Sequence, residues 1–186
     1  LPAVDLVQLR AKRLTVASAD DLAAHVTHER ELVGVDIERD EEHANGTFAA
    51  TYGEVLRELQ AGKLLEAQSR CRQELEANPE DPELLHLMAL IYLNAAEYDH
   101  VVEWASRAIR KQPKPSYLAT LGTALRRAGH LEEASKVFDK AIQLNPDDAT
   151  LWANLGGVLE ELTRQSDAVL CFQQALKLDP YQLEAA

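Results

Sequence analysis

The sequence predicts an all-α protein, built as a right-handed solenoid of about four helical hairpins with a separate segment at the N-terminal end. Three observations carry this prediction: a composition that favours helices, prolines that return at a nearly constant interval, and two blocks of sequence that repeat one another. A unit repeated in this way packs mainly against its neighbouring copies. We therefore expect a linear array of units.

The composition favours helices and limits the classes of partner. Of the 186 residues, 46% are hydrophobic but only 5% are aromatic, so the core must consist mainly of Leu, Ala and Val. Such a composition, poor in glycine, is typical of helical proteins. The formal net charge of −12 argues against nucleic-acid binding. No apolar run approaches the roughly 20 residues that span a bilayer, so we expect neither nucleic acid nor a membrane as partner.

The spacing of prolines sets the length of the repeating unit. Prolines return at intervals of 34, 33 and 34 residues: Pro79, Pro113, Pro146 and Pro180. Helices usually end at or before the residue that precedes a proline. Between prolines lie two stretches with helical apolar spacing, separated by breaks at Ala61-Gly62, Ala128-Gly129 and Leu162-Thr163. The unit is therefore predicted to be a pair of helices.

The last two units share residues at matching offsets. The matches are Ala134, Phe138, Ala141 and Pro146 in one unit, and Ala168, Phe172, Ala175 and Pro180 in the next. With Trp152 and Leu155-Gly156, this pattern resembles the tetratricopeptide repeat, whose unit is 34 residues long. The resemblance implies an α-solenoid in which small residues let two helices approach and large residues fill the gap to the next hairpin. The third and fourth repeats are also similar to those of bacterial O-linked N-acetylglucosamine transferase-like proteins.

The resemblance divides the chain into a non-repeat segment, 1–47, and an array, 48–186. The expected repeats are about 48–81, 82–114, 115–148 and 149–182, with the start of a further repeat at 183–186. Because the chain opens without Met and stops inside a repeat, we expect it to be part of a longer protein. One residue is missing around Lys114, which predicts either a tighter junction with a changed pitch or a shortened helix end.

The N-terminal segment is predicted to hold one helix and short strands. Ser18 is a good helix N-cap, and Leu22 and Val26 follow on one face. The alternation of Val33, Val35 and Ile37 is typical of a strand. These apolar residues need cover, so we expect the segment to pack on the first repeat.

Two candidate chemistries in this segment have a simpler interpretation. Asp36 and Glu38 resemble metal-binding carboxylates of ribonuclease D-like exonucleases, but the repeats begin too soon afterwards for the rest of that fold. His25, His28 and Glu29 share a helical face, yet zinc requires three or four ligands, and a solvated surface fits better. We expect no enzyme, no metal and no cofactor.

The two cysteines indicate a reducing environment. Cys71 and Cys171 are separated by several repeats, too far for one disulfide. Two unpaired thiols are typical of intracellular proteins, so we expect a cytoplasmic location.

The resemblance places the binding surface on the first helix of each hairpin, which lines a concave groove. The groove residues that it implies are His86, Leu90, Asn94, Thr120, Thr123, Arg126, Arg127, Asn154, Glu160 and Glu161. Asn154 resembles the groove asparagine with which O-linked N-acetylglucosamine transferases bind a peptide backbone. The lysines of chaperone-binding repeats are absent. We expect a scaffold that binds a protein or peptide segment. The alternative is the substrate-recruiting arm of a larger enzyme, such as a glycosyltransferase, with its catalytic domain beyond residue 186.

Two further expectations follow from repeat positions. Arg126 and Arg127 occupy the same positions as Glu160 and Glu161 one repeat later. They are expected to form two ion pairs between repeats or to divide the groove into a cationic and an anionic band. The second expectation is a homodimer through the open C-terminal end, where the apolar residues are Val169, Phe172 and Leu176.

Overall fold

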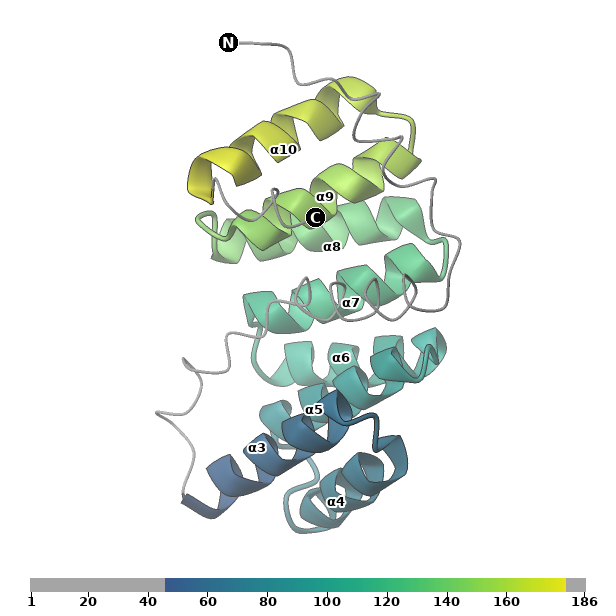
Figure 1. Cartoon of the computed structure of the whole chain (residues 1–186), viewed down its shortest axis with the longest axis vertical. Helices are drawn as coiled ribbons and strands as arrows, with labels where there is room; N and C mark the ends of the chain where they lie inside the picture. Colours follow the sequence, from purple (N-terminus) through teal and green to yellow (C-terminus); the bar gives the residue numbers. More distant parts are fainter. Residues whose placement is uncertain (1–45, 180–186) are drawn as a thin grey trace. The chain divides into compact units, whose positions relative to one another are not determined.

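The computed structural model describes residues 46–179, and within this range the chain forms helices joined by short turns. The helices pair into four hairpins: α3 (Gly46–Gln60) with α4 (Leu64–Ala77), α5 (Pro82–Asn94) with α6 (Tyr98–Lys111), α7 (Pro115–Arg127) with α8 (Leu131–Leu144), and α9 (Ala149–Glu161) with α10 (Gln165–Leu178). Each helix packs on the next along the chain (Figure 1). The all-α solenoid is confirmed for these residues. The helix and strands expected before residue 46 lie outside the described range.

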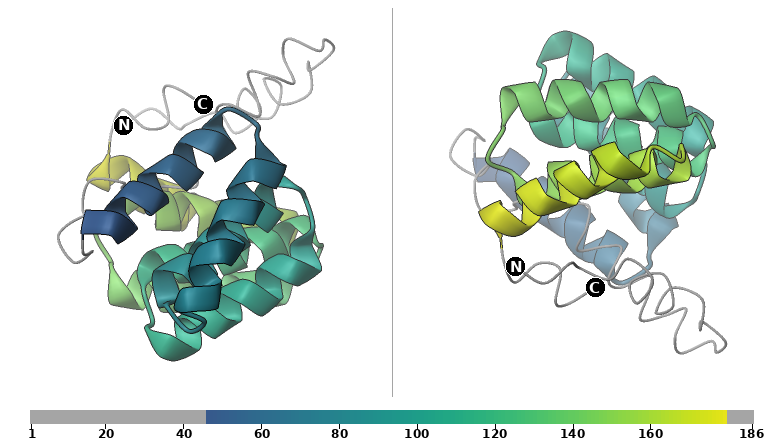
Figure 2. Two further views of the ribbon diagram at one scale, coloured as in Figure 1. Left: turned by 90° about the horizontal axis from the view of Figure 1, so that it is seen from below. Right: turned by 90° about the horizontal axis from the view of Figure 1, so that it is seen from above.

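The first helices of the hairpins form a continuous layer. α3 packs on α5, α5 on α7, and α7 on α9, in addition to the contacts within each hairpin. Seen along the stack, successive hairpins are turned relative to one another (Figure 2). The four first helices therefore make up the inner layer, and α4, α6, α8 and α10 make up the second layer.

Within a hairpin, an aromatic ring lies directly on a glycine. Phe138 of α8 is fully buried, and its ring lies only 2.8 Å from where a Cβ would stand on Gly122 of α7. Phe172 of α10 lies in the same way against Gly156 of α9, at 2.7 Å. The missing side chain is therefore what lets the two helices approach in the third and fourth hairpins.

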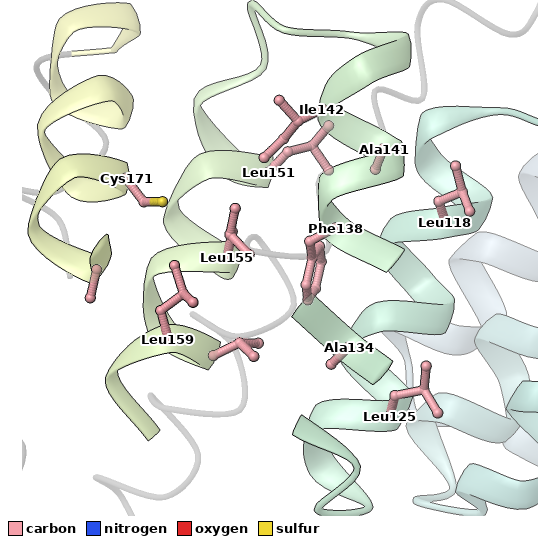
Figure 3. Close-up of a cluster of buried hydrophobic side chains, with 12 residues drawn as sticks. Leu118, Leu125, Ala134, Phe138, Ala141, Ile142, Leu151, Leu155, Leu159 and Cys171 are labelled. Atoms are coloured by element: carbon pink, nitrogen blue, oxygen red, sulfur yellow. The ribbon is translucent and has the colours of Figure 1, made fainter. Parts of the chain in front are cut away.

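The other side of the Phe138 ring faces the next hairpin. Leu151, Leu155 and Leu159 of α9 belong to the same buried cluster as Phe138 (Figure 3). Large residues thus fill the gap between hairpins, as the repeat pattern predicts. At the last hairpin, Phe172 is only partly buried.

The turn inside each hairpin uses one left-handed residue at a repeated position. These residues have φ values of 73° at Gly62, 58° at Ala96, 84° at Gly129 and 61° at Thr163. After α7, for example, His130 N donates to Leu125 O and Gly129 N to Arg126 O, which is the Schellman pattern of helix ends. Three of these turns lie at the breaks predicted from the sequence. The other, at Ala96, holds alanine in a conformation that favours glycine.

The repeat that is one residue short near Lys114 has a shorter loop between its hairpin and the next one. α6 has 14 residues and α7 has 13, like the corresponding helices of other hairpins. The helix ends are therefore not shortened. Asp81 and Asp148 cap α5 and α9 by accepting two backbone N–H groups each. Lys114 stands at the N-cap of α7 and makes no such side-chain bond.

We predict opposite effects from exchanging glycine and alanine at two of the turns. Ala96→Gly should stabilise the fold by up to about 1 kcal/mol, because a left-handed conformation strains any residue with a Cβ. Gly129→Ala should destabilise it by about 1–2 kcal/mol for the same reason. A steric clash adds nothing to this strain, because a Cβ there would meet no other atom within 4 Å. Urea unfolding of both variants measures this, and equal signs for the two changes would contradict the explanation.

Candidate functional site: the inner face of the array

The ten candidate groove residues all lie on α5, α7 and α9 of the inner layer, but their exposure differs. His86, Leu90 and Thr120 are buried. Thr123, Arg126, Asn154 and Glu160 are partly buried, and Asn94, Arg127 and Glu161 are exposed. The structure thus differs from the expectation for the first three residues, which pack inside the array. The accessible part of the inner face lies mainly on α7 and α9.

His86 is buried between two hairpins. Its side chain on α5 is in contact with α7, where Nε2 lies 2.9 Å from Thr120 Oγ1 and the ring lies 4.5 Å from the Tyr117 ring. Thr120 Oγ1 also lies 3.1 Å from Ser116 O. The Thr120 hydroxyl thus lies within hydrogen-bond distance of both groups, and its role toward His86 depends on the imidazole tautomer. Burial, with the nearby charge of Lys114, lowers the pKa of His86 to about 3.

A partly buried ion pair lies beside His86. Lys114 Nζ donates to Glu83 Oε1 at 2.7 Å, and the two side chains are about one quarter exposed. Burial acts to raise the pKa of Glu83, but the hydrogen bond and the charge of Lys114 outweigh burial and hold this pKa below its usual value. Lys114 thus joins α7 to α5 at the position where α5 and α9 have a capping aspartate. Sequence reasoning missed this pair, although the Pro113-Lys114-Pro115 irregularity marks its position.

The inner face carries an ion pair between adjacent repeats, as the sequence predicts. Arg126 of α7 donates through Nε to Glu161 Oε1 at 2.8 Å, and Nη2 lies 2.6 Å from the same oxygen. The Arg126 guanidinium lies against Gly157, which has no side chain to displace it.

Two inner-face side chains bond to their own helices. Thr123 Oγ1 donates to Ala119 O at 2.9 Å, and Asn94 Nδ2 donates to Leu90 O at 3.0 Å. Asn154 stands partly accessible on α9, at the repeat position that Thr120 occupies on α7. The inner face can therefore offer amide, hydroxyl, guanidinium and carboxylate groups to a bound chain.

Neither thiol has the properties of a nucleophile. Cys71 Sγ donates to Leu84 O at 3.4 Å, and burial raises the pKa of Cys71 to about 12. Burial also raises the pKa of Cys171. Among residues 46–179, no cluster of three or more His, Cys, Asp or Glu residues is arranged to hold a metal ion. Asp36, Glu38, His25, His28 and Glu29 lie outside this range.

The stacked hairpins define a helical-repeat protein of the α-solenoid class. The family model of the tetratricopeptide repeat matches residues 120–182. Residues 120–182 thus carry the tetratricopeptide repeat, as the offsets of their Ala, Phe and Pro residues predict. No helix in the described part of the chain has the length and apolar character needed to cross a membrane.

Solved structures of repeat proteins resemble the chain. A structure of pilF from Pseudomonas aeruginosa superposes with a TM-score of 0.68, at 24% identity, over 73% of this chain and 63% of the other. A thermophilic TPR protein from Thermus thermophilus gives a TM-score of 0.64, also at 24% identity, over 73% of this chain and 77% of the other. At such identities the likeness concerns the fold alone.

Curated relatives are larger proteins with varied names. Human protein O-mannosyl-transferase TMTC1 is 30% identical over 103 residues, covering 53% of this chain and 12% of the relative. Anaphase-promoting complex subunit 3 of Schizosaccharomyces pombe is 32% identical over 107 residues, covering 57% of this chain and 16% of the relative. The peroxisomal targeting signal receptor of Candida albicans is 27% identical, covering 77% of this chain and 31% of the relative. The chain thus spans only a small part of each relative. The tetratricopeptide fold supports a role as a protein-interaction scaffold with protein partners.

We predict that His86 makes the fold sensitive to acid. Its pKa of about 3 in the folded protein lies below the unfolded value of about 6.5, so only the unfolded chain gains this proton as the pH falls between these values. The free energy of unfolding should therefore fall by about 1–2 kcal/mol from this residue between roughly pH 7 and pH 5. Urea unfolding at the two pH values measures the loss.

The variant His86→Asn should be less stable near neutral pH but should lose less stability on acidification. His130→Asn changes an exposed histidine and should keep the pH dependence of the parent chain. An unchanged pH dependence in His86→Asn would show that the buried imidazole is not its source.

Proposed function

We propose that the inner face of α7 and α9 binds an extended segment of a protein partner. The observation that supports this most directly is the contrast between inner helices: α5 is buried along Leu84–Leu93, whereas α7 and α9 keep several polar side chains accessible. Thr123, Asn154 and Glu160 are among them. Extended chains carry unpaired backbone N–H and C=O groups, which such polar side chains can bond.

The array suits this task because its backbone is held by packing of each hairpin on its neighbours. A preformed surface loses little conformational entropy when a partner binds. Side chains such as Asn154 can bond a backbone without reading its sequence, while the charged residues supply discrimination. We propose that the binding module itself catalyses no reaction and takes neither nucleic acid nor a membrane as partner.

The second candidate function is recruitment of substrate to an enzyme. It is favoured by the similarity to protein O-mannosyl-transferase TMTC1. The matched region makes up 12% of the length of that protein. On this proposal the same groove binds proteins that a catalytic domain elsewhere in the parent protein modifies. Reading the parent gene beyond residue 186 for a transferase domain distinguishes the two.

Two further properties are part of the proposal. Phe172 and Leu176 of α10 are only partly buried, whereas Phe138 and Ile142, at the same positions of α8, are buried. This difference supports self-association through the open face of α10. The free, buried Cys71 and Cys171 support a cytoplasmic location.

We predict that a photo-crosslinking residue on the inner face captures the partner. Benzoylphenylalanine in place of Asn154 should give adducts in an extract of the source organism, because this side chain lies on the proposed binding face. The matched control is the same residue in place of Lys140, which is exposed on α8 of the second layer. Adducts from position 140 but none from position 154 would contradict groove binding.

A further inference from the structure

The Arg126 side chain has an unusual placement on the inner face. A Cβ built on Gly157 would lie 3.0 Å from Nη1, 3.1 Å from Cζ and 3.1 Å from Nη2 of Arg126. A point almost equally distant from three atoms of a planar group lies over its face, because at its edge the central carbon would be farther away. One face of the guanidinium therefore lies flat on the backbone of α9.

The glycine is what allows this placement. The same repeat position is Thr123 on α7 and Leu90 on α5, and either side chain would occupy the space that the guanidinium takes. One turn before Gly157 stands Ala153, which is also small and partly accessible. These two small residues therefore leave space for the arginine on the inner face of α9.

Glu161 fixes the orientation of the guanidinium in its plane. Nε lies 2.8 Å and Nη2 lies 2.6 Å from Glu161 Oε1, so one edge of the group is engaged. The first face covers Gly157. With 24% of the Arg126 side chain exposed, the face opposite Gly157 is the part of the group directed away from α9.

We propose that this second face of Arg126 is a stacking platform for an aromatic side chain of the segment that the groove binds. Guanidinium groups stack on aromatic rings through cation–π and planar contact, and an arginine already bonded at its edge keeps that ability. The ring would lie above Arg126 and beside Ala153. This inference rests on the proposed function, because it names the chemistry of the bound segment.

An acidic side chain fits this place less well than an aromatic one. A carboxylate would compete with Glu161 for the engaged edge of Arg126. It would also approach the charges of Glu160 and Glu161, and like charges at close range oppose binding. An aromatic ring needs neither to displace Glu161 nor to bring a further negative charge.

A random peptide library displayed on phage provides the probe. Selection on the whole chain should enrich peptides with Trp, Tyr or Phe, and a selected peptide should bind about 3- to 10-fold more weakly when that aromatic residue is replaced by Leu. On Arg126→Lys, which keeps the charge but not the plane, the same replacement should change the affinity little. Arg127→Lys is the matched control and should preserve the aromatic preference.

The outcomes separate this inference from the proposed function. Enrichment of acidic residues, or an aromatic preference that survives in Arg126→Lys, would overturn the platform alone, provided that Asn154→Arg blocks the selected peptides. Selected peptides that all bind Asn154→Arg as well as the parent chain would overturn groove binding and the platform together. Circular dichroism of each variant confirms that the helices are retained.

Discussion

The close contact between a phenylalanine ring and a glycine is the constraint on which the packing of the third and fourth hairpins depends. In the third hairpin the Phe138 ring occupies the place of a side chain on Gly122, and in the fourth the Phe172 ring does the same at Gly156. This contact brings the two helices of a hairpin together and leaves the far side of the ring to the leucines of the next hairpin. The same phenylalanine side chain thus packs within its own hairpin and, in the third hairpin, against the next hairpin.

The inner face follows from this arrangement. When the hairpins stack through their rings and leucines, the first helices pack side by side, and their polar residues meet across the junctions. His86 with Thr120 joins the second hairpin to the third, and Arg126 with Glu161 joins the third to the fourth. The first of these contacts is buried, and the second lies at the surface where a partner can meet it.

The fold could be predicted from the sequence because its determinants are local and repeated. Ala134, Phe138 and Pro146 recur one unit later, and the turn residues recur with them. The candidate site was predicted less completely. Repeat position alone placed His86 in the groove, but its neighbours Tyr117 and Thr120 come from another helix and enclose it.

The pairing of Arg126 shows the same limit. Its ion pair with the following repeat was expected, but the contact of its guanidinium with Gly157 was not. To predict this contact, one must know the path of a side chain across two helices, and the spacing of residues in the sequence does not give that path. The packing of the N-terminal segment stays a prediction because residues 1–45 lie before the described range, and the division of the chain near residue 47 stays a prediction with it.

The most direct test of the account compares two glycine-to-alanine changes within helices. At Gly122 the added methyl group meets the Phe138 ring, whereas at Gly53 of α3 it meets no other atom within 4 Å. Urea unfolding should show that Gly122→Ala destabilises the array by about 1–3 kcal/mol, as overpacking does. Gly53→Ala should stabilise it by about 0.5–1 kcal/mol through helix propensity. If Gly122→Ala were as stable as Gly53→Ala, the contact between ring and glycine would not be the constraint that holds the hairpins together.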